Sequence, residues 1–253
     1  MKLSILSQNI RCRDDANGHS VAERAPRLYQ RIRACDPDLI GLQEASKKWE
    51  NFLEPLKEEY GVIWMYRQPI ESLEATPLYW KKALFELVEE EHFWLSETPQ
   101  VPTKGWNADC YRICSHATLR HKESGKLIHF YNTHFDWVGK GPRESAQLII
   151  RKAEKHGDLP VFCTADYNFT PESAPWHSMR SWFYDARETL CPENITSTCV
   201  GYNPPVENIR RIIDMCFYHG SGVTPTEYRV LTETYDGKHV SDHFGVYFEF
   251  EVK

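Results

Sequence analysis

The sequence predicts an α/β protein in which two packed β-sheets are covered by outer helices. Strand-like apolar runs occur from one end of the 253-residue chain to the other, and the few helical patterns lie between some of them. A hairpin signature and a proline-rich middle interrupt the strand–helix alternation that a doubly wound parallel sheet requires. The length suits one large domain, so we expect residues 1–253 to form a single domain.

Four helical patterns occur, at residues 20–36, 49–56, 142–153 and 174–182. The first opens with a capping box, because Ser20 is followed three residues later by Glu23, and the Asp36-Pro37 pair ends it. Pro55 interrupts the second pattern. In the first and third patterns, apolar residues recur at helical spacing, which predicts one inward-facing side.

Six apolar, strand-like runs carry a side chain suited to metal or phosphate chemistry at or beside one end. These side chains are Asn9 (run 3–9), Glu44 (38–44), His134 (127–134), Asp166 and Asn168 (161–168), Asp214 (211–214), and Asp242 with His243 (240–243, just before the last strand). Strand ends of one layer can converge in space, so residues scattered over the whole chain could share one site.

Two further segments complete the strand prediction. Residues 112–119 and 127–134 flank Lys122-Glu-Ser-Gly-Lys126, a hairpin signature in which Gly125 can adopt a positive φ. Residues 244–252 alternate between apolar and polar side chains, which predicts a strand with one buried face.

The bulk composition excludes several classes of protein. A net charge of −6 and a pI near 6.0 give no global attraction to nucleic acid or to an anionic membrane, although a local basic pocket or a bound metal ion could supply positive charge. No apolar run approaches the roughly 18 residues of a transmembrane helix. The first strand starts at Lys2-Leu3, which leaves no room for a signal peptide, so we expect a cytoplasmic chain. No feature indicates an obligate protein partner.

The eight cysteines do not predict a disulfide framework or a zinc site. No two of them form a Cys-x-x-Cys pair. Several, such as Cys163 and Cys216, stand inside apolar runs, where a free thiol packs as a small hydrophobic group. We therefore expect free cysteines in a reducing compartment.

Glu44 is a candidate ligand for a divalent metal ion. It follows an apolar run, and a buried carboxylate needs a cation or several hydrogen-bond donors. Mg²⁺ fits because it takes oxygen ligands. The alternative is a salt bridge to Lys47 or Lys48. Asn9 could hold a metal-bound water or orient Glu44, and it could equally be an ordinary hydrogen-bonding residue.

The remaining strand-end residues suit proton transfer and phosphate binding. Strand alternation points Asp166 and Asn168 to the same face, where a carboxylate can take a proton from water and an amide can donate to a phosphate oxygen. An Asx turn closing the strand is the alternative. Asp214 and His243 form a candidate pair in which the carboxylate fixes the imidazole tautomer. His134 could donate to the scissile phosphate. Taken singly, each histidine could be structural.

Together these motifs resemble the endonuclease/exonuclease/phosphatase superfamily over essentially the whole chain. The matching motifs are Gln8-Asn9, Gln43-Glu44, Asn132-Thr-His134, Ala165-Asp-Tyr-Asn168, Ile213-Asp214 and Ser241-Asp-His243. Residues 93–99, 104–107, 134–139 and 241–244 resemble a bacterial branch akin to nocturnin-type catalytic domains. Ala165 stands where glycine is usual, and Trp137 stands where histidine or asparagine is commoner.

The resemblance implies a four-layer αββα sandwich, DNase I-like, with the site at one edge of the two sheets. It implies that Glu44, supported by Asn9, holds Mg²⁺, with Mn²⁺ as a substitute, and that Asp242 adds a metal or water contact. Asp166 would activate the attacking water, with the other strand-end residues binding phosphate or relaying a proton. Four further residues become candidates for substrate binding: Arg112, Glu74, Trp137 and Arg143. Arg112 and Glu74 could instead be salt-bridge residues.

The predicted function is therefore a Mg²⁺-dependent phosphoester hydrolase, a nuclease or phosphodiesterase, or a phosphatase. A small substrate, such as a nucleotide, sugar phosphate or lipid headgroup, is the alternative to a polynucleotide, since no Lys/Arg-rich tract follows a long backbone. A catalytically inactive binding module is the alternative from another class. Substrate choice would depend on the loops at residues 67–77, 98–111 and 188–208.

Overall fold

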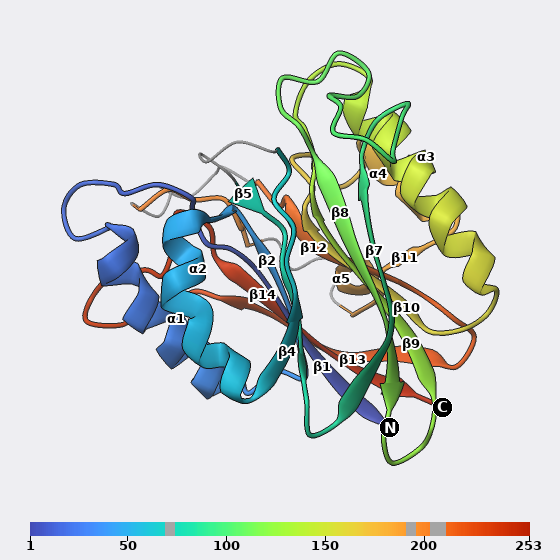
Figure 1. The fold of residues 1–253 in the computed structure, drawn as a ribbon, viewed down its shortest axis with the longest axis horizontal. Coiled ribbons are helices and arrows are strands. Elements are labelled where there is room, and N and C mark those ends of the chain that lie inside the picture. Colours follow the sequence, from blue (N-terminus) through green and yellow to red (C-terminus); the bar gives the residue numbers. More distant parts are fainter. Residues whose placement is uncertain (69–73, 191–195, 203–210) are drawn as a thin grey trace.

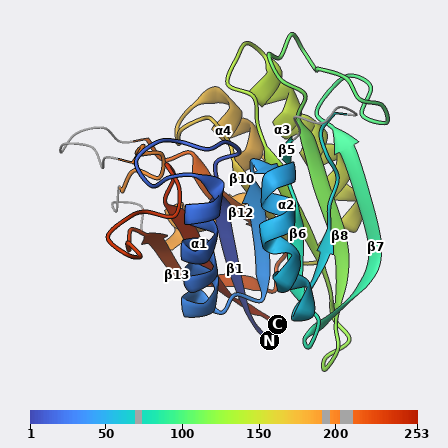
Figure 2. The same ribbon diagram turned by 60° about the vertical axis from the view of Figure 1, so that its left-hand side comes forward.

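The protein is a sandwich of two six-stranded mixed sheets with helices on both outer faces (Figure 1). The computed structural model describes residues 1–68, 74–190, 196–202 and 211–253. Figure 2 shows α1 and α2 on one side of the sheets and α3 and α4 on the other. This arrangement confirms the predicted four-layer α/β sandwich.

The first sheet has the strand order β13-β14-β1-β2-β6-β4. Its members are β1 (Lys2–Asn9), β2 (Leu39–Gln43), β4 (Tyr60–Ile63), β6 (Leu78–Lys81), β13 (Val223–Leu231) and β14 (Gly245–Val252). Strands β1 and β2 are parallel, with Asn9 opposite Gln43. Asn9 and the residue after Gln43 therefore lie at the same edge of the sheet.

The second sheet has the strand order β11-β12-β10-β9-β8-β7. Its members are β7 (Phe85–Trp94), β8 (Ile113–His121), β9 (Leu127–His134), β10 (Val161–Asp166), β11 (Tyr184–Asp185) and β12 (Asp214–His219). Parallel pairing places His134 opposite Asp166, and antiparallel pairing places Asp166 opposite Asp214. The prediction that a strand leads into Asp214 was wrong. Asp214 begins β12, and it reaches the common edge because β12 runs opposite to β10.

The helices largely confirm the predicted positions. They are α1 (Val21–Cys35), α2 (Lys47–Leu53), α3 (Gly141–Ala153), α4 (Ala174–Arg180) and α5 (Ala186–Leu190), with 3₁₀ turns η1 (Glu54–Glu58) and η2 (Glu154–His156). Ser20 and Glu23 form the predicted capping box at α1. Helix α2 stops at Leu53 rather than continuing through residue 56, because Pro55 falls in the first turn of η1. A two-stranded ribbon of β3 (Ala45–Ser46) and β5 (Glu74–Ala75) lies beside the site edge.

Three hydrophobic clusters fill the three interfaces between layers. Leu28 and Trp49 belong to the cluster beneath α1 and α2, and Ile149 belongs to the cluster beneath α3 and α4. The middle cluster joins the two sheets and includes Phe130 and Phe248. No described helix has the length and hydrophobicity that crossing a bilayer requires. Seven cysteines carry free thiols, and Cys191 lies outside the described residues.

A buried polar link joins the two sheets just below the site edge. Gln43 Nε2 donates to Asn132 Oδ1 at 2.8 Å, and Asn132 Nδ2 donates to the backbone oxygens of Leu42 and Pro77 at 2.8 and 2.9 Å. The side chains of Gln43 and Asn132 are fully buried. Gly41 makes room for this link, because a Cβ there would lie 2.3 Å from Thr164 Oγ1 and 2.5 Å from Asn132 Oδ1.

Substituting Gly41 by alanine should destabilise the protein. The added methyl group has no space between buried polar side chains, so we expect a loss of about 1–3 kcal/mol in the free energy of unfolding. Denaturant unfolding of Gly41→Ala measures it. Gly141→Ala is the matched control, since its Cβ would meet only Asp136 Cβ at an ordinary 3.9 Å. Equal stabilities of the two variants would contradict the assigned role of Gly41.

Candidate active site

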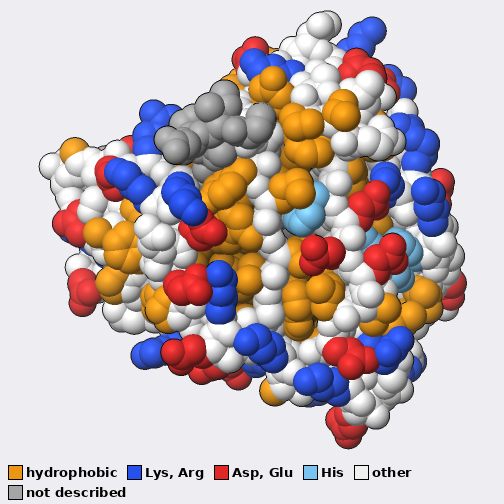
Figure 3. Space-filling view, viewed as in Figure 1, with side chains coloured by type: hydrophobic (Ala, Val, Ile, Leu, Met, Phe, Trp, Pro, Cys, Tyr) orange, Lys and Arg blue, Asp and Glu red, His pale blue; other side chains and the backbone are white. Residues whose placement is uncertain are grey.

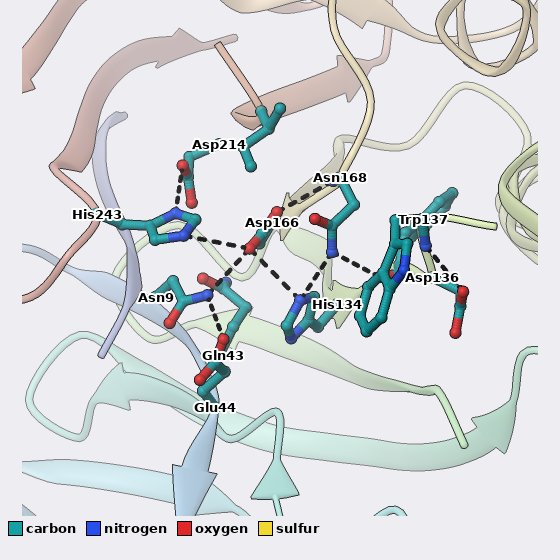
Figure 4. Close-up of polar contacts among 12 residues, drawn as sticks. Asn9, Gln43, Glu44, His134, Asp136, Trp137, Asp166, Asn168, Asp214 and His243 are labelled. Carbon is teal, nitrogen blue, oxygen red and sulfur yellow. Dashed lines mark hydrogen bonds and ion pairs between the residues drawn. The ribbon is translucent and has the colours of Figure 1, made fainter. Parts of the chain in front are cut away.

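Residues from both sheets converge at one edge of the sandwich. Asn9 and Glu44 come from the ends of β1 and β2, and His134 and Asp166 come from the ends of β9 and β10. Asp214 and His243 add side chains from the start of β12 and from the segment before β14. Figure 4 shows Asp166 at the centre, with Asn9, His134 and His243 turned toward it. The structure thus brings the strand-end residues of the sequence prediction together.

Glu44 lies directly after β2 in a left-handed backbone conformation, with φ 61°. Its carboxylate accepts hydrogen bonds from Asn9 Nδ2 at 3.0 Å and from the Cys12 amide at 3.0 Å. Burial works to raise the pKa of Glu44, but these hydrogen bonds outweigh it and hold the pKa below the ordinary value. Glu44 is therefore an ionised carboxylate in a largely buried position. The alternative salt bridges are not formed, since Lys47 and Lys48 pair with Glu50 and Asp14.

Asn9 orients carboxylates rather than offering its oxygen to an ion. Its Nδ2 donates to Glu44 at 3.0 Å and to Asp166 at 2.9 Å, while its Oδ1 accepts from the Arg11 amide at 2.9 Å. Rotating the amide by 180° would place Oδ1 against two carboxylates and Nδ2 against a donor. The hydrogen bonds therefore fix the orientation. Of the roles that the sequence left open for Asn9, these hydrogen bonds favour orienting Glu44.

Asp166 lies between two histidines and shares its site with a second aspartate. Its Oδ2 lies 3.4 Å from His134 Nε2 and 3.8 Å from His243 Nε2. Burial raises the pKa of Asp166 to about 6, with His243 opposing the shift and Asp214 adding to it. A carboxylate with this pKa can take up and release a proton near neutral pH.

His243 and Asp214 form the predicted pair, with Nδ1 2.9 Å from Oδ2. Burial alone would lower the pKa of His243, but the facing carboxylates of Asp214 and Asp166 hold it well above the ordinary value. The imidazole of His243 is therefore positively charged at neutral pH, with one proton on each ring nitrogen. Its Nε2–H faces Asp166 and the cleft, where a cationic donor stabilises an anion.

His134 is the neutral counterpart of His243. Asn168 Nδ2 donates to Phe135 O at 2.9 Å and lies 3.0 Å from His134 Nε2, so Nε2 is the acceptor and Nδ1 carries the proton. Burial, followed by the charges of Arg112 and Arg67, holds the pKa of His134 well below its ordinary value. Among the described residues, His134 Nδ1 is buried without a hydrogen-bond partner. A cleft ligand could accept this hydrogen bond.

Arg112 supplies unpartnered donors next to His134. The residue is 3% exposed, yet Nε and Nη1 have no hydrogen-bond partner among the described residues. Its closest carboxylate, Asp136 Oδ2, lies 3.8 Å from Nε. The guanidinium lies 5.3 Å from the ring centroid of Trp137, which is 55% exposed. A buried, incompletely paired guanidinium in a cleft is suited to a phosphate oxygen.

A cleft of about 350 Å³ is lined by Glu44, His134, Asp166, Asn168 and His243 among others. Its lining is richer in positively charged side chains than the chain as a whole. Five arginines border it, namely Arg11, Arg13, Arg67, Arg112 and Arg211. Its acidic lining residues are Glu44, Glu74 and Asp166. The local basic pocket that composition left open is therefore present. Arg67 begins the predicted specificity loop at residues 67–77 and Arg211 begins the run 211–214, whereas no sequence pattern places Arg11 or Arg13 at the cleft.

Cys12, Cys110 and Cys199 also line the cleft, although the sequence predicted only structural roles for the cysteines. Cys110 comes from the predicted specificity loop at residues 98–111. The loop at 67–77 contributes Arg67 and Glu74, with residues 69–73 outside the described residues. In the third loop, 188–208, residues 191–195 and 203–208 lie outside the described part.

Four predicted site residues are not among those that line the cleft. Asn9 and Asp214 lie behind it and contact the lining residues Glu44 and His243, and the other two are Asp242 and Arg143. Asp242 pairs with Arg11 at 3.5 Å and accepts from Ser241 Oγ at 3.1 Å, so its carboxylate supports a cleft arginine. It belongs to none of the metal-capable groups among the described residues. Arg143 is exposed in the first turn of α3 and is not among the residues that line the cleft. The helix start was predicted correctly, but the helical turn directs this side chain to solvent.

Glu74 was predicted as a substrate-binding residue, and the structure places it in the cleft lining, beside Glu44. Cys12, Glu44 and Glu74 each offer a ligand atom, and these atoms lie within 4.8 Å of one another. Burial and then the nearby Glu44 raise the pKa of Glu74, although Arg67 pairs with it at 2.8 Å. A divalent cation would relieve the repulsion between the two carboxylates. Burial and Glu44 also raise the pKa of the Cys12 thiol, which leaves carboxylate oxygens as the main donors. This donor set fits Mg²⁺ or Mn²⁺.

Comparison with known proteins agrees with this geometry. The model of the Endonuclease/Exonuclease/phosphatase family matches residues 6–243. A Bacteroides thetaiotaomicron structure, a mannosyl-6-phosphatase, is 30% identical, with a TM-score of 0.87 over 98% of this chain and 99% of its own. Another structure from that organism, an endonuclease/exonuclease/phosphatase family protein, is 29% identical, with a TM-score of 0.91 over 100% and 98%. The human nocturnin catalytic domain with bound sulfate shares the fold at 18% identity, with a TM-score of 0.78 over 100% and 95%.

Proposed function

The chain belongs to the endonuclease/exonuclease/phosphatase family, and we propose that it is a divalent-metal-dependent hydrolase of small phosphate esters. One observation carries the proposal. The same cleft holds a pair of carboxylates suited to a cation and the unpartnered buried donors of Arg112 and His134, suited to an anion. A phosphate ester with its counter-cation satisfies both sets of groups at once.

In this proposal, the protein's own residues divide the work. Glu44 and Glu74 would hold Mg²⁺ or Mn²⁺, which when bound supplies positive charge to a phosphate oxygen. Asp166 takes the proton of the attacking water. Arg112 and His134 donate to the phosphate oxygens and hold the group in place. His243, kept protonated by Asp214, stabilises the negative charge that grows on the phosphate in the transition state.

A small substrate suits the cleft better than a polynucleotide. The volume of about 350 Å³ falls at the lower end of ordinary small-ligand pockets. On the face drawn in Figure 3, acidic and basic side chains are interspersed without a continuous basic track. The 30% identical mannosyl-6-phosphatase adds support for a phosphorylated sugar. Trp137 would then offer an exposed ring against which a sugar can pack.

Hydrolysis of a phosphodiester bond in single-stranded nucleic acid is the second candidate function. Trp137 favours it, because an exposed indole over an arginine is also a platform for a nucleobase. The two candidate functions differ in substrate. They share the proposed metal ligands, Glu44 and Glu74, and the proposed base, Asp166.

Activity should depend on pH through Asp166. Burial raises the pKa of Asp166 to about 6, and only the ionised form can take a proton from water. We therefore expect kcat/KM to fall about tenfold per pH unit as the pH drops below about 6. The raised pKa of His243 keeps this residue protonated through the same range. Measuring kcat/KM as a function of pH at saturating metal tests this prediction. If kcat/KM does not fall below about pH 6, a residue other than Asp166 is the general base.

A substrate panel tests the proposed function. The 253-residue protein with Mg²⁺ is given hexose 6-phosphates, nucleoside monophosphates, and single-stranded RNA and DNA oligonucleotides. We expect release of inorganic phosphate from at least one sugar phosphate and little cleavage of the oligonucleotides. Cleaved oligonucleotides with intact monoesters would replace the first candidate by the second. No turnover of any ester would contradict both.

A further inference from the structure

Three histidines gather on the second sheet, away from the active site. They are His116 on β8, His129 on β9 and His156 in η2, and one ring nitrogen of each lies within 4.8 Å of the others. Helices α3 and α4 cover this face of the sheet (Figure 1). His129 precedes the site residue His134 by five positions on β9, which is roughly 16 Å at the rise of a strand. The cluster is therefore separate from the cleft.

Two of these imidazoles are already spaced like ligands of one ion. His116 Nε2 lies 3.3 Å from His129 Nδ1. Two nitrogens that each bind Zn²⁺ at about 2.0–2.1 Å with a tetrahedral angle lie about 3.3–3.4 Å apart. Both residues are nearly fully buried, at 3% and 4% exposure, and β8 and β9 fix their backbones. The two nitrogens now share a hydrogen bond, so metal binding requires the donating ring to carry its proton on its other nitrogen, while the strand backbones stay in place.

His156 completes the group from a more adaptable position. It belongs to the 3₁₀ turn that follows α3 and is partly exposed. Its ring now stacks on His129 with centroids 3.5 Å apart, and its Nε2 contacts Tyr131 OH at 2.7 Å. Rotation of this side chain out of the stack would bring a nitrogen to the pair. The hydroxyl of Tyr131 is available as an outer-shell partner of His156, whereas Thr118 Oγ1, 3.1 Å from His129 Nδ1, would give up that contact to the metal.

The protonation state of the cluster suits metal binding. Burial and mutual repulsion lower the pKa of His116 to about 2 and that of His129 to about 3, and burial lowers the pKa of His156. All three rings are therefore neutral at pH 7, with lone pairs available. With Nδ1 as the ligand atom, the proton of His129 would lie on Nε2, which has no hydrogen-bond partner among the described residues and is free to carry it. The carboxylates of Glu89 and Glu91 act on His156 and would partly offset added positive charge, against Lys155 and against Lys152, which pairs with Glu91.

We propose that His116, His129 and His156 bind a transition-metal ion of the Zn²⁺ type at a site separate from the catalytic cleft. Three imidazole nitrogens favour Zn²⁺ over Mg²⁺, which takes oxygen ligands. With water as the fourth ligand, the ion would join β8 and β9 to the turn that ends α3. The site's expected effect is on stability, because it lies outside the cleft.

The test separates this site from the active site by using a Glu44→Gln background, which weakens the carboxylate group in the cleft. Chelator-treated Glu44→Gln protein in excess Mg²⁺ is titrated with Zn²⁺ by calorimetry and with Co²⁺ by visible absorption. We expect uptake of a single Zn²⁺ ion, an intense Co²⁺ band typical of tetrahedral coordination, and a rise in Tm with Zn²⁺.

Adding His156→Gln should lower the Zn²⁺ affinity by more than the about 10- to 100-fold that loss of an outer-shell partner costs, and should remove the Co²⁺ band. His177→Gln, at an exposed histidine on α4, is the matched control and should change neither. Because His156 is partly exposed, its variant should fold, and its Tm in Mg²⁺ alone verifies this. The proposal would be overturned if the Glu44→Gln protein takes up no Zn²⁺, or if adding His156→Gln leaves the Zn²⁺ affinity unchanged.

Discussion

Replacing Asp166 by asparagine should lower kcat by roughly 10²–10⁴-fold, the usual contribution of a general base. The amide keeps the size of the side chain but cannot take a proton from water. Asp166 also helps to hold the proton on His243, 3.8 Å away, so the substitution weakens the cationic donor too. Steady-state phosphate release at saturating substrate and metal measures the effect, and KM should change far less than kcat.

Asp242→Asn is the matched control for that experiment. Asp242 precedes His243 in the chain but pairs with Arg11 instead of lining the cleft. We expect its loss to reduce kcat by less than about tenfold, the scale of an exposed or partly exposed ion pair. Equal losses of kcat in the two variants would show that Asp242 acts in the reaction, as the Ser241-Asp-His243 motif suggests. That result would contradict the assignment of Asp166 as the only base.

Glu44→Gln should act on metal affinity. The substitution removes the charge of a carboxylate that Asn9 and the Cys12 amide hold in place, and it leaves Glu74 as the remaining acidic ligand of that group. We expect the Kd for Mg²⁺ to rise by at least about 10–100-fold, and activity to recover partly at high Mg²⁺. Calorimetry measures the affinity directly.

Glu86→Gln provides the control for the metal measurement. Glu86 is an exposed residue of the edge strand β7, paired with Arg120. Its neutralisation should leave Mg²⁺ binding unchanged. If Glu44→Gln binds Mg²⁺ as tightly as the unaltered protein, the metal ligands lie elsewhere, with Asp166 and Asp214 as the remaining candidates among the described groups.

The positions of the strand-end residues were predictable because parallel strands end at one edge of a sheet. Asn9 with Glu44, and His134 with Asp166, follow this rule. Asp214 does not, because an antiparallel strand contributes its first residue, and apolar runs do not reveal strand direction. The pattern of packed sheets likewise followed from the runs and the hairpin, whereas the strand order did not, because pairing depends on contacts between distant segments.

Most of the site residues that the sequence analysis did not predict come from loops. Arg11, Cys12 and Arg13 line the cleft from a segment without regular spacing, so no periodicity could place them there. Glu74 was predicted to bind substrate, and its position beside Glu44 depends on the pairing of β3 with β5, which no sequence pattern revealed. Gln43 and Asn132 appeared in the sequence analysis only as members of two motifs. The hydrogen bond between them could not be predicted, because it depends on how closely the two sheets approach at Gly41.

The central claim is that one cleft hydrolyses a phosphate ester by combining two groups of residues. Glu44 and Glu74 bind the metal ion, and Asp166 takes the proton of the attacking water. The most direct measurement is phosphate release by chelator-treated protein before and after addition of Mg²⁺, with Asp166→Asn measured in parallel. We expect no release without metal, restored release with Mg²⁺, and little release by Asp166→Asn even when it binds Mg²⁺ normally. Undiminished hydrolysis in the absence of metal, or by Asp166→Asn, would contradict the claim.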